Sequence, residues 1–275
     1  MGATVAAPLR PTRHVRAEPA SARGDVMAAP RARTYVEIAP PRALAAFVEC
    51  FWVHRVDGPP PPEGRRLLPD GRANMVWIAQ VGVRLAGPAS TYLEPPPLER
   101  MLAFGVRLRP GAISSLLRVE ATEVADTHVL LDAIDPRLAH RIDARLAVAP
   151  DPRAAVVALA GELTRALAEA PLPDPAVRAA VVALDDPRGT VAGAAARAHL
   201  SERELQRRFV REVGFAPKTL HRVLRFQRFM DQLQVPRAEL AGAAAVAGYA
   251  DQAHLSREAR KLTGLTPRQL LHHDH

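Results

Sequence analysis

Two stretches near the C-terminal end carry side chains that can form hydrogen bonds with the edges of nucleic-acid bases. These side chains fall into two groups: Arg203, Gln206, Arg207 and Arg211, and then Gln252, His254, Arg257 and Lys261. Arginine can donate two hydrogen bonds to guanine, and glutamine can pair in a similar way with adenine. Arginine and lysine farther along such a segment more often contact phosphates, which adds affinity without selecting a sequence. The chemistry that these residues favour is therefore DNA binding.

The two groups lie in corresponding segments of an internal repeat. Residues 201–220 align with residues 251–270 at a constant offset of 50 residues. The following identities recur in register: Leu205 and Leu255, Arg207 and Arg257, Gly214 and Gly264, Pro217 and Pro267, Leu220 and Leu270. Matches of this kind predict two copies of one structural unit.

Each copy has the local signals of a helix-turn-helix. A short helix of small residues is expected over 190–198 and again over 238–247, each followed by a tight turn. Ser201 and Asp251 are suited to cap the next helix, and Ser201 with Glu204 has the spacing of a capping box. Glycines at 214 and 264 then end the two helices. One face of each second helix is apolar, and the opposite face carries the polar groups named above. A single such face would more often be only solvent-exposed, but two capped copies favour DNA recognition.

The segment 218–233 lies between the copies and has a broad apolar stripe at helical spacing. Sixteen residues of helix give a rod of about 24 Å. A linker of that length could place two recognition helices in successive major-groove segments, which lie about 34 Å apart.

The part before residue 174 has a different pattern. Residues 74–80, 81–85 and 101–108 are predicted strands, 44–53 suits either helix or strand, and a short helix is expected after Pro110. Helices are predicted to begin near Pro136 and Pro152. We therefore expect an α+β N-terminal domain followed by an all-α DNA-binding domain with two helix-turn-helix units joined by a linker helix. The expected limits are 1–33 for a disordered basic tail, 34–135 for a mixed sensing or dimerisation domain, 136–173 for a helical connector and linker, and 174–271 for the DNA-binding domain.

Charge and composition agree with a polyanionic partner. The chain of 275 residues has a net charge of +8 and a pI near 10.7. Residues 174–275 contain 16 basic and 11 acidic residues. No apolar run is long enough for a membrane span, and the N-terminus lacks a secretory signal, so a cytoplasmic, non-membrane protein is expected. Translation could start at Met1 or at Met27.

Residues 177–271 resemble the DNA-binding domain of AraC-type (AraC/XylS) transcriptional regulators. The resemblance rests on the motifs LSERELQRRFVREVGFAPK (200–218), RVLRFQR (222–228) and GYADQAHLSRE (248–258). It implies a module of two helix-turn-helix units on a linker helix. By position, it assigns base recognition to Arg203, Gln206, Arg207, Gln252, His254 and Arg257.

The N-terminal part is more weakly similar to the domain of one subgroup of these regulators, through FVECFWVHR (47–55), LLPDGRANMVW (67–77) and FGVRLRPGA (104–112). In the wider family this position often holds an effector-sensing or dimerising domain. The chain departs from the family at Ala194, Ala243 and Ala259, where larger residues are usual, and at Phe229, where a small residue is usual. We expect Phe229 to fill the space left by Ala243 or Ala259, and Gly242 to weaken the second unit.

Other residue types give weaker signals. Cys50, the single cysteine, suits a buried structural role better than a reactive thiol. The histidines at 272, 273 and 275 are expected in a frayed tail rather than in a metal site. A small-molecule pocket could use Trp52, Trp77, Asp70, Asn74, Arg107 and Arg109. Core packing of the two tryptophans, surface positions for the two arginines and a turn at Asp70-Gly71 are the simpler explanation. No catalytic triad, phosphate loop, metal-ligand spacing or cofactor motif is evident.

These observations predict a sequence-specific, DNA-binding transcription regulator that is not an enzyme. The implied partners are double-stranded DNA and RNA polymerase, with a small-molecule effector and a second copy of the chain as further candidates. Two alternatives stay open. An enzyme-linked regulator would need clustered titratable residues in an N-terminal pocket. An architectural protein would bind DNA without sequence preference.

Overall fold

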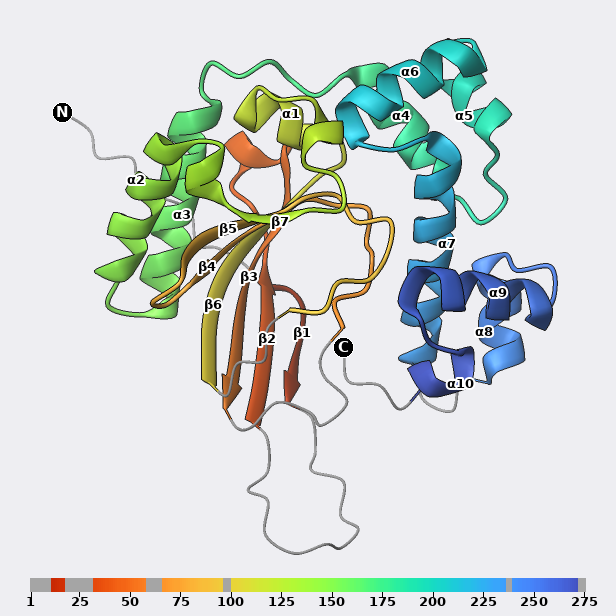
Figure 1. The fold of residues 1–275 in the computed structure, drawn as a ribbon, viewed down its shortest axis with the longest axis horizontal. Helices are drawn as coiled ribbons and strands as arrows, with labels where there is room; N and C mark the ends of the chain where they lie inside the picture. Colours follow the sequence, from red (N-terminus) through yellow and green to blue (C-terminus); the bar gives the residue numbers. More distant parts are fainter. Residues whose placement is uncertain (1–10, 18–31, 58–65, 96–99, 236–238, 272–275) are drawn as a thin grey trace, which may run out of the picture.

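The computed structural model describes residues 11–17, 32–57, 66–95, 100–235 and 239–271. Figure 1 shows a sheet domain with helices at one side, followed by helices arranged along a long, nearly upright helix, α7. The predicted fold class is confirmed: an N-terminal α+β domain precedes an all-α domain.

The N-terminal domain is built on one antiparallel sheet of seven strands in the order β1-β2-β3-β6-β4-β5-β7. The strands are β1 (Pro11–Ala17), β2 (Ala32–Ile38), β3 (Val48–Asp57), β4 (Asn74–Ile78), β5 (Gly82–Ala86), β6 (Arg100–Leu108) and β7 (His128–Leu130). Strand β6 lies between β3 and β4, so Phe104 is opposite Val53 on one side and Trp77 on the other. Alternate residues then point to opposite faces of this sheet.

Three of the predicted strands are confirmed as β4, β5 and β6. The undecided segment 44–53 divides into the end of a 3-10 helix, η1 (Arg42–Leu44), and the start of β3. Part of the segment 1–33, which was expected to be disordered, is instead a strand: residues 11–17 form β1 and pair with β2. The rest of the tail, 1–10 and 18–31, and the histidines after 271 lie outside the described residues.

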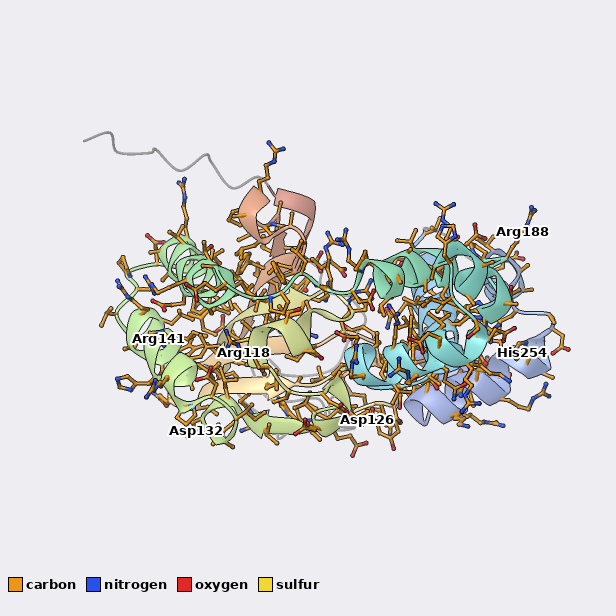
Figure 2. The ribbon with its side chains drawn as sticks, turned by 90° about the horizontal axis from the view of Figure 1, so that it is seen from above. Arg118, Asp126, Asp132, Arg141, Arg188 and His254 are labelled. Carbon is orange, nitrogen blue, oxygen red and sulfur yellow. The ribbon has the colours of Figure 1, made fainter. Side chains whose placement is uncertain are left out.

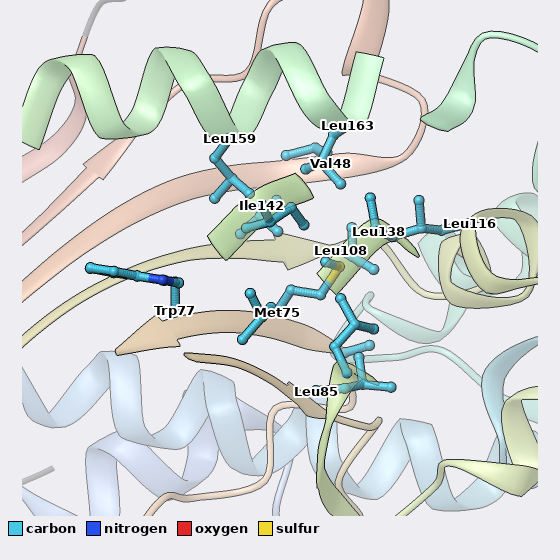
Figure 3. Close-up of a cluster of buried hydrophobic side chains, with 14 of the residues drawn as sticks. Val48, Met75, Trp77, Leu85, Leu108, Leu116, Leu138, Ile142, Leu159 and Leu163 are labelled. Atoms are coloured by element: carbon cyan, nitrogen blue, oxygen red, sulfur yellow. The ribbon is translucent and has the colours of Figure 1, made fainter. Parts of the chain in front are cut away.

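One face of the sheet is covered by the helical hairpin α2 (Pro136–Ala147) and α3 (Pro152–Leu167). In the close-up of Figure 3, Ile142 and Leu159 from these helices lie beside Val48 and Met75 from the sheet. All four side chains are at most 2 % exposed. Trp77 stacks on Phe104 and donates a hydrogen bond from Nε1 to Asp143 Oδ1 at 2.7 Å, which fixes α2 to β4.

The hairpin therefore belongs to the N-terminal domain. Residues 136–173 were expected to connect two domains, but Leu138, Ile142 and Leu163 share one apolar cluster with the strands. Periodicity along the chain locates these helices, whereas only their packing partners show which domain they complete. The short elements α1 (Ala112–Leu117), η2 (Ala121–Glu123) and η3 (Leu131–Ala133) close the edge of the same core.

The C-terminal domain has two apolar clusters that share helix α7 (Pro217–Leu233). The first cluster combines α4 (Pro175–Leu184), α5 (Val191–Arg197) and α6 (Glu202–Val213) with Leu220 and Leu224 of α7. The second combines α8 (Leu240–Ala247), α9 (Gln252–Thr263) and α10 (Pro267–Leu270) with Val223, Phe226, Phe229 and Met230 of α7. The broad apolar stripe of α7 thus packs against two groups of helices, as the sequence predicted.

Helix α4 was not anticipated from the sequence. Its signals are present, because Asp174 accepts a hydrogen bond from Ala176 N and Pro175 occupies the first turn. Val177, Ala180 and Leu184 form its buried side. These three side chains share the first apolar cluster with Phe209 of the recognition helix. None of the helices in the described ranges combines the length and apolar character that crossing a membrane requires.

Phe229 lies in the second cluster with Ala243 and Ala259 and has no exposed surface. Its ring lies edge-on to Tyr249 at 6.2 Å and 6.3 Å from Phe226. We expect Phe229→Ala to lower the free energy of unfolding by about 3–5 kcal/mol, since it leaves an unfilled cavity. Adding Ala259→Phe should recover part of that loss. Denaturant titration followed by circular dichroism measures both changes, and a double variant no more stable than Phe229→Ala would refute the compensation.

Gly242 lies inside α8, is exposed, and has open space where a Cβ would stand. Gly242→Ala should therefore stabilise the second unit by about 1 kcal/mol through helix propensity alone. Gly193→Ala in α5 should give a smaller gain in stability, because an added Cβ would lie 3.1 Å from the capping Thr190 Oγ1. Thermal unfolding of the two alanine variants compares them. An equal gain at both positions would mean that the cap contact is irrelevant.

Candidate nucleic-acid interface

The first helix-turn-helix unit is formed by α5 and α6. Thr190 caps α5 by accepting a hydrogen bond from Gly193 N at 3.0 Å. The chain turns at His199, whose φ is 55°, and Ser201 Oγ then accepts from Glu204 N at 3.2 Å to begin α6. Helix α6 ends at Gly214, whose φ of 93° is in the left-handed region that favours glycine.

The second unit repeats this geometry with α8 and α9. Gly248, with a φ of 90°, ends α8. Asp251 Oδ1 accepts from His254 N at 2.6 Å, so a carboxylate replaces the serine as the cap. Gly264 ends α9 with a φ of 72°. The tight turn, N-cap and glycine end that the repeat predicted are therefore present in both copies.

The proposed capping box at Ser201 is only half formed. Glu204 N does donate to Ser201, but the Glu204 carboxylate binds Arg207 at 2.8 Å and Arg208 at 2.7 Å. Hydrogen bonds from these two guanidinium groups lower the pKa of Glu204 to about 2. The carboxylate therefore remains ionised at physiological pH and holds Arg207 along the helix surface.

The face of α6 opposite Leu205 and Phe209 is exposed and polar. Arg203 and Gln206 have no hydrogen bond or ion pair with any described residue. Arg207 is paired only within its own helix, and 69 % of its side chain is accessible. Arg211 lies one turn farther on, and its side chain binds Glu212. Its carbonyl oxygen accepts a hydrogen bond from Ser114 Oγ of α1, so the end of α6 contacts the N-terminal domain, while the first half of α6 is accessible.

On α9 the sequence-predicted residues separate into two kinds. Gln252, Arg257 and Lys261 are exposed, and in the described residues none has a side-chain partner. His254 is half-buried: its ring packs edge-on against Tyr249 at 5.3 Å, and its Nε2 lies 3.5 Å from Glu258. In Figure 2, His254 and Arg188 lie at the far end of the molecule from Arg141 of the α2–α3 hairpin.

The carboxylate of Glu258 is a feature that the sequence reasoning missed. It accepts two hydrogen bonds from Arg225 at 2.7 and 3.3 Å, and it lies 3.4 Å from Arg222. Arg225 also lies over the Tyr249 ring, 5.1 Å from its centroid. Arg222 and Arg225, three residues apart on one face of the linker, were the signal in the sequence that could have indicated this contact. These contacts fix the angle between α7 and α9.

One turn farther along the linker, Arg228 connects α7 to the end of α4. Its Nη1 donates to the Asp185 carbonyl oxygen at 2.6 Å and to Asp185 Oδ1 at 3.3 Å. Both helix-turn-helix units are therefore held to α7 by buried apolar contacts and by arginines of the linker. The polar faces of α6 and α9 keep one fixed relation to each other.

The residues suggested for a small-molecule pocket separate into two groups. Asp70 and Asn74 lie beside Arg107, with Asp70 Oδ2 3.5 Å from Arg107 Nε and Asn74 opposite Arg107 in the sheet, whereas Trp77 and Arg109 lie elsewhere. Trp77 lies in the core beneath α2, whereas Trp52 and Arg107 belong to the opposite face of the sheet. Arg109 is exposed and donates to Ala45 O at 2.9 Å. The core and surface interpretation thus describes Trp77 and Arg109. Asp70 Oδ1 accepts a hydrogen bond from Arg72 N at 2.9 Å, as is usual for aspartate in a turn.

Cys50 is buried and forms no disulfide. Burial raises the pKa of its thiol to about 12, although the nearby Arg107 opposes this effect, so the thiol is protonated and weakly nucleophilic. The structural role expected for Cys50 fits this environment. Within the described ranges, no group of three or more histidine, cysteine, aspartate or glutamate side chains is arranged to hold a metal ion.

Comparison with known proteins gives two family matches. Residues 36–130 match a domain of unknown function (DUF6597), and residues 194–273 match a helix-turn-helix domain. A search of curated proteins found no match to the chain.

A search of solved structures matched ToxT from Vibrio cholerae. A 1.65 Å structure of ToxT has 12% sequence identity and a TM-score of 0.46, and the match covers 81% of this chain and 97% of that chain. A second structure, of ToxT from Vibrio cholerae O395, has 11% identity and a TM-score of 0.44, with 80% and 95% covered. The family matches and the geometry of the repeat agree on the C-terminal part, and the chain carries an AraC-type helix-turn-helix domain, a DNA-binding module of transcription regulators, behind an N-terminal domain of unknown function.

Proposed function

We propose that this protein is a sequence-specific transcription regulator that recognises a two-part DNA site with helices α6 and α9. The observation that supports this most strongly is the pair of capped helices, each with an exposed polar face, packed on one shared linker helix. A recognition helix contacts base edges through residues near its N-terminal end. Of the unpaired polar side chains, Arg203 and Gln206 lie in the first half of α6, and Gln252 is the first residue of α9.

The geometry favours different roles for the candidate residues. Arg203 and Gln206 on α6, and Gln252 and Arg257 on α9, are exposed and free to meet base edges. Arg207 is accessible but oriented by Glu204, which would keep its guanidinium pre-positioned for one base or phosphate. Arg211 and Lys261 lie in the last turns, where phosphate contact is the more frequent role. His254 would act from its half-buried position by shaping the start of α9.

The N-terminal domain would supply regulation. Its position ahead of a DNA-binding module agrees with a sensing or dimerising role, and binding at a promoter would bring the protein to RNA polymerase. A small-molecule effector and a second copy of the chain are the partners that this proposal includes. The apolar core occupies one face of the sheet, so the other face, around Trp52 and Arg107, is the place to look for an effector.

Sequence selectivity is tested by substituting one free arginine on each recognition helix. Arg203→Ala and Arg257→Ala should each relax discrimination at particular base pairs, by about 1–3 kcal/mol per position. Selection of bound genomic fragments, repeated with each variant, reads out the motif. Arg153→Ala, on an exposed position of α3, is a control of equal charge change. A uniform loss of affinity over all sequences would instead indicate an architectural DNA-binding protein.

Phosphate contact is tested by salt dependence. Lys261→Ala should weaken binding to every sequence alike and reduce the slope of log affinity against log salt concentration by about one. Arg257→Ala, one turn earlier on the same helix, should change the preferred sequence as well. Titrations of one fixed DNA site at several salt concentrations give the slopes. A Lys261→Ala variant with an unchanged slope would remove this residue from the interface.

A further inference from the structure

The two domains meet through a loop, residues 66–71, that we call the docking loop. Its glycine, Gly71, has a φ of 70° and faces helix α7: an added Cβ would lie 2.6 Å from Leu220 Cδ1 and 3.6 Å from Val223 Cγ1. Gln227 of α7 donates from Nε2 to the Pro69 carbonyl oxygen at 2.6 Å. Leu68 packs against the second apolar cluster of the C-terminal domain. The docking loop therefore lies along the shared linker helix.

The same loop reaches the C-terminal end of recognition helix α9. Arg66 Nη1 donates to the Thr263 carbonyl oxygen at 3.0 Å. The guanidinium group also binds Glu94 and lies over the ring of Tyr92, 4.7 Å from its centroid. The bond to Thr263 satisfies a carbonyl group that has no partner within the helix, and the positive charge suits the negative end of the helix dipole.

A second part of the N-terminal domain holds the end of recognition helix α6. Gly214 lies so close to η2 that an added Cβ would be 3.0 Å from the Ala121 carbonyl oxygen and 2.9 Å from Ala125 Cβ. Ser114 Oγ of α1 donates to Arg211 O at 3.4 Å. The domain thus contacts the C-terminal ends of both recognition helices, and the exposed residues expected to meet bases lie toward their N-terminal ends.

A partly buried ionic cluster fixes the docking loop to the sheet. Asp70 lies 3.5 Å from Arg107 Nε, and Arg72 donates to the Asp70 carbonyl oxygen at 2.9 Å. Arg107 also binds Glu37 at 2.8 Å, and Arg72 binds Glu49. These charges come from β2, β3 and β6, so the loop moves with the sheet and not independently of it.

We propose that the N-terminal domain is part of the DNA-recognition device, because its contacts with α6, α7 and α9 hold the two recognition helices at one spacing and angle. This inference rests on the proposed function. It assigns specificity for spacing to Arg66, Gly71 and Gln227, which act as positioning residues and touch no base. A change of one base pair between the two blocks of a DNA site displaces one block by about 3.4 Å and rotates it by roughly 35°. A rigid protein should reject that change more strongly than a loosened one.

The test uses the full-length chain and DNA sites whose two blocks, taken from the wild-type motif, are separated by the selected spacing or by one base pair more or fewer. We expect the wild type to bind the altered spacings about tenfold more weakly. The double variant Arg66→Ala with Gln227→Ala should reduce that ratio to about threefold or less, with unchanged affinity for a DNA carrying one block only. Gly71→Ala, which combines the left-handed φ with the close approach to Leu220, should act in the same direction.

The matched control is the double variant Arg153→Ala with Gln232→Ala. It removes one arginine and one glutamine side chain, as the test variant does, but from other positions on α3 and α7. Neither side chain has a hydrogen bond or ion pair among the described residues. Thermal unfolding checks that each variant is folded. A folded double variant or Gly71→Ala variant with the wild-type spacing ratio would overturn the inference. Failure of the wild type itself to select any two-block motif would instead overturn the proposed function, so the two failures are distinguishable.

Discussion

The burial of one side of helix α7 is the constraint on which the DNA-binding half depends. Leu220 and Leu224 lie in the core of the first unit, and Phe226 and Phe229 lie in the core of the second. Neither unit can cover its own apolar surface without the linker. At about 25 cal/mol for each Å² of apolar surface, large aromatic side chains stabilise such a joint strongly. The helix is therefore a shared core element, and the two units cannot rotate independently of it.

Electrostatic contacts set the orientation of the helices that apolar burial holds against α7. Arg225 and Glu258 join the linker to α9, while Arg228 joins it to the end of α4. The Arg225–Glu258 pair is largely buried and is expensive to break, because removing one partner leaves the other charge without compensation. These contacts specify the angle at which the recognition helices leave the linker. The free arginines on the outer faces have the opposite property: they have no described partner and are available to a polyanion.

The N-terminal domain adds a second set of contacts to the DNA-binding domain. Its sheet carries the ionic cluster around Arg107, the cluster holds the docking loop, and the loop contacts the linker and the end of α9. Any ligand or partner that changed this face of the sheet would act directly on the contacts of the DNA-binding domain. Coupling between two sites requires such a difference in contacts between states, and here the chain of contacts is short.

The sequence by itself determined the repeat, the caps and the helix ends, because these depend on residues within one or two turns of each other. Ser201, Asp251 and the glycines at 214 and 264 behave as their types predict. It also predicted three strands of the sheet, since alternation is local. Only the tertiary structure decided that α2 and α3 complete the N-terminal core, that α4 closes the first unit, and that His254 is engaged with Tyr249 and Glu258. It also decided that Arg66 meets Thr263 across 197 positions of sequence. Such contacts depend on which apolar faces find each other in space, and the period of a helix or strand carries no information about its partner.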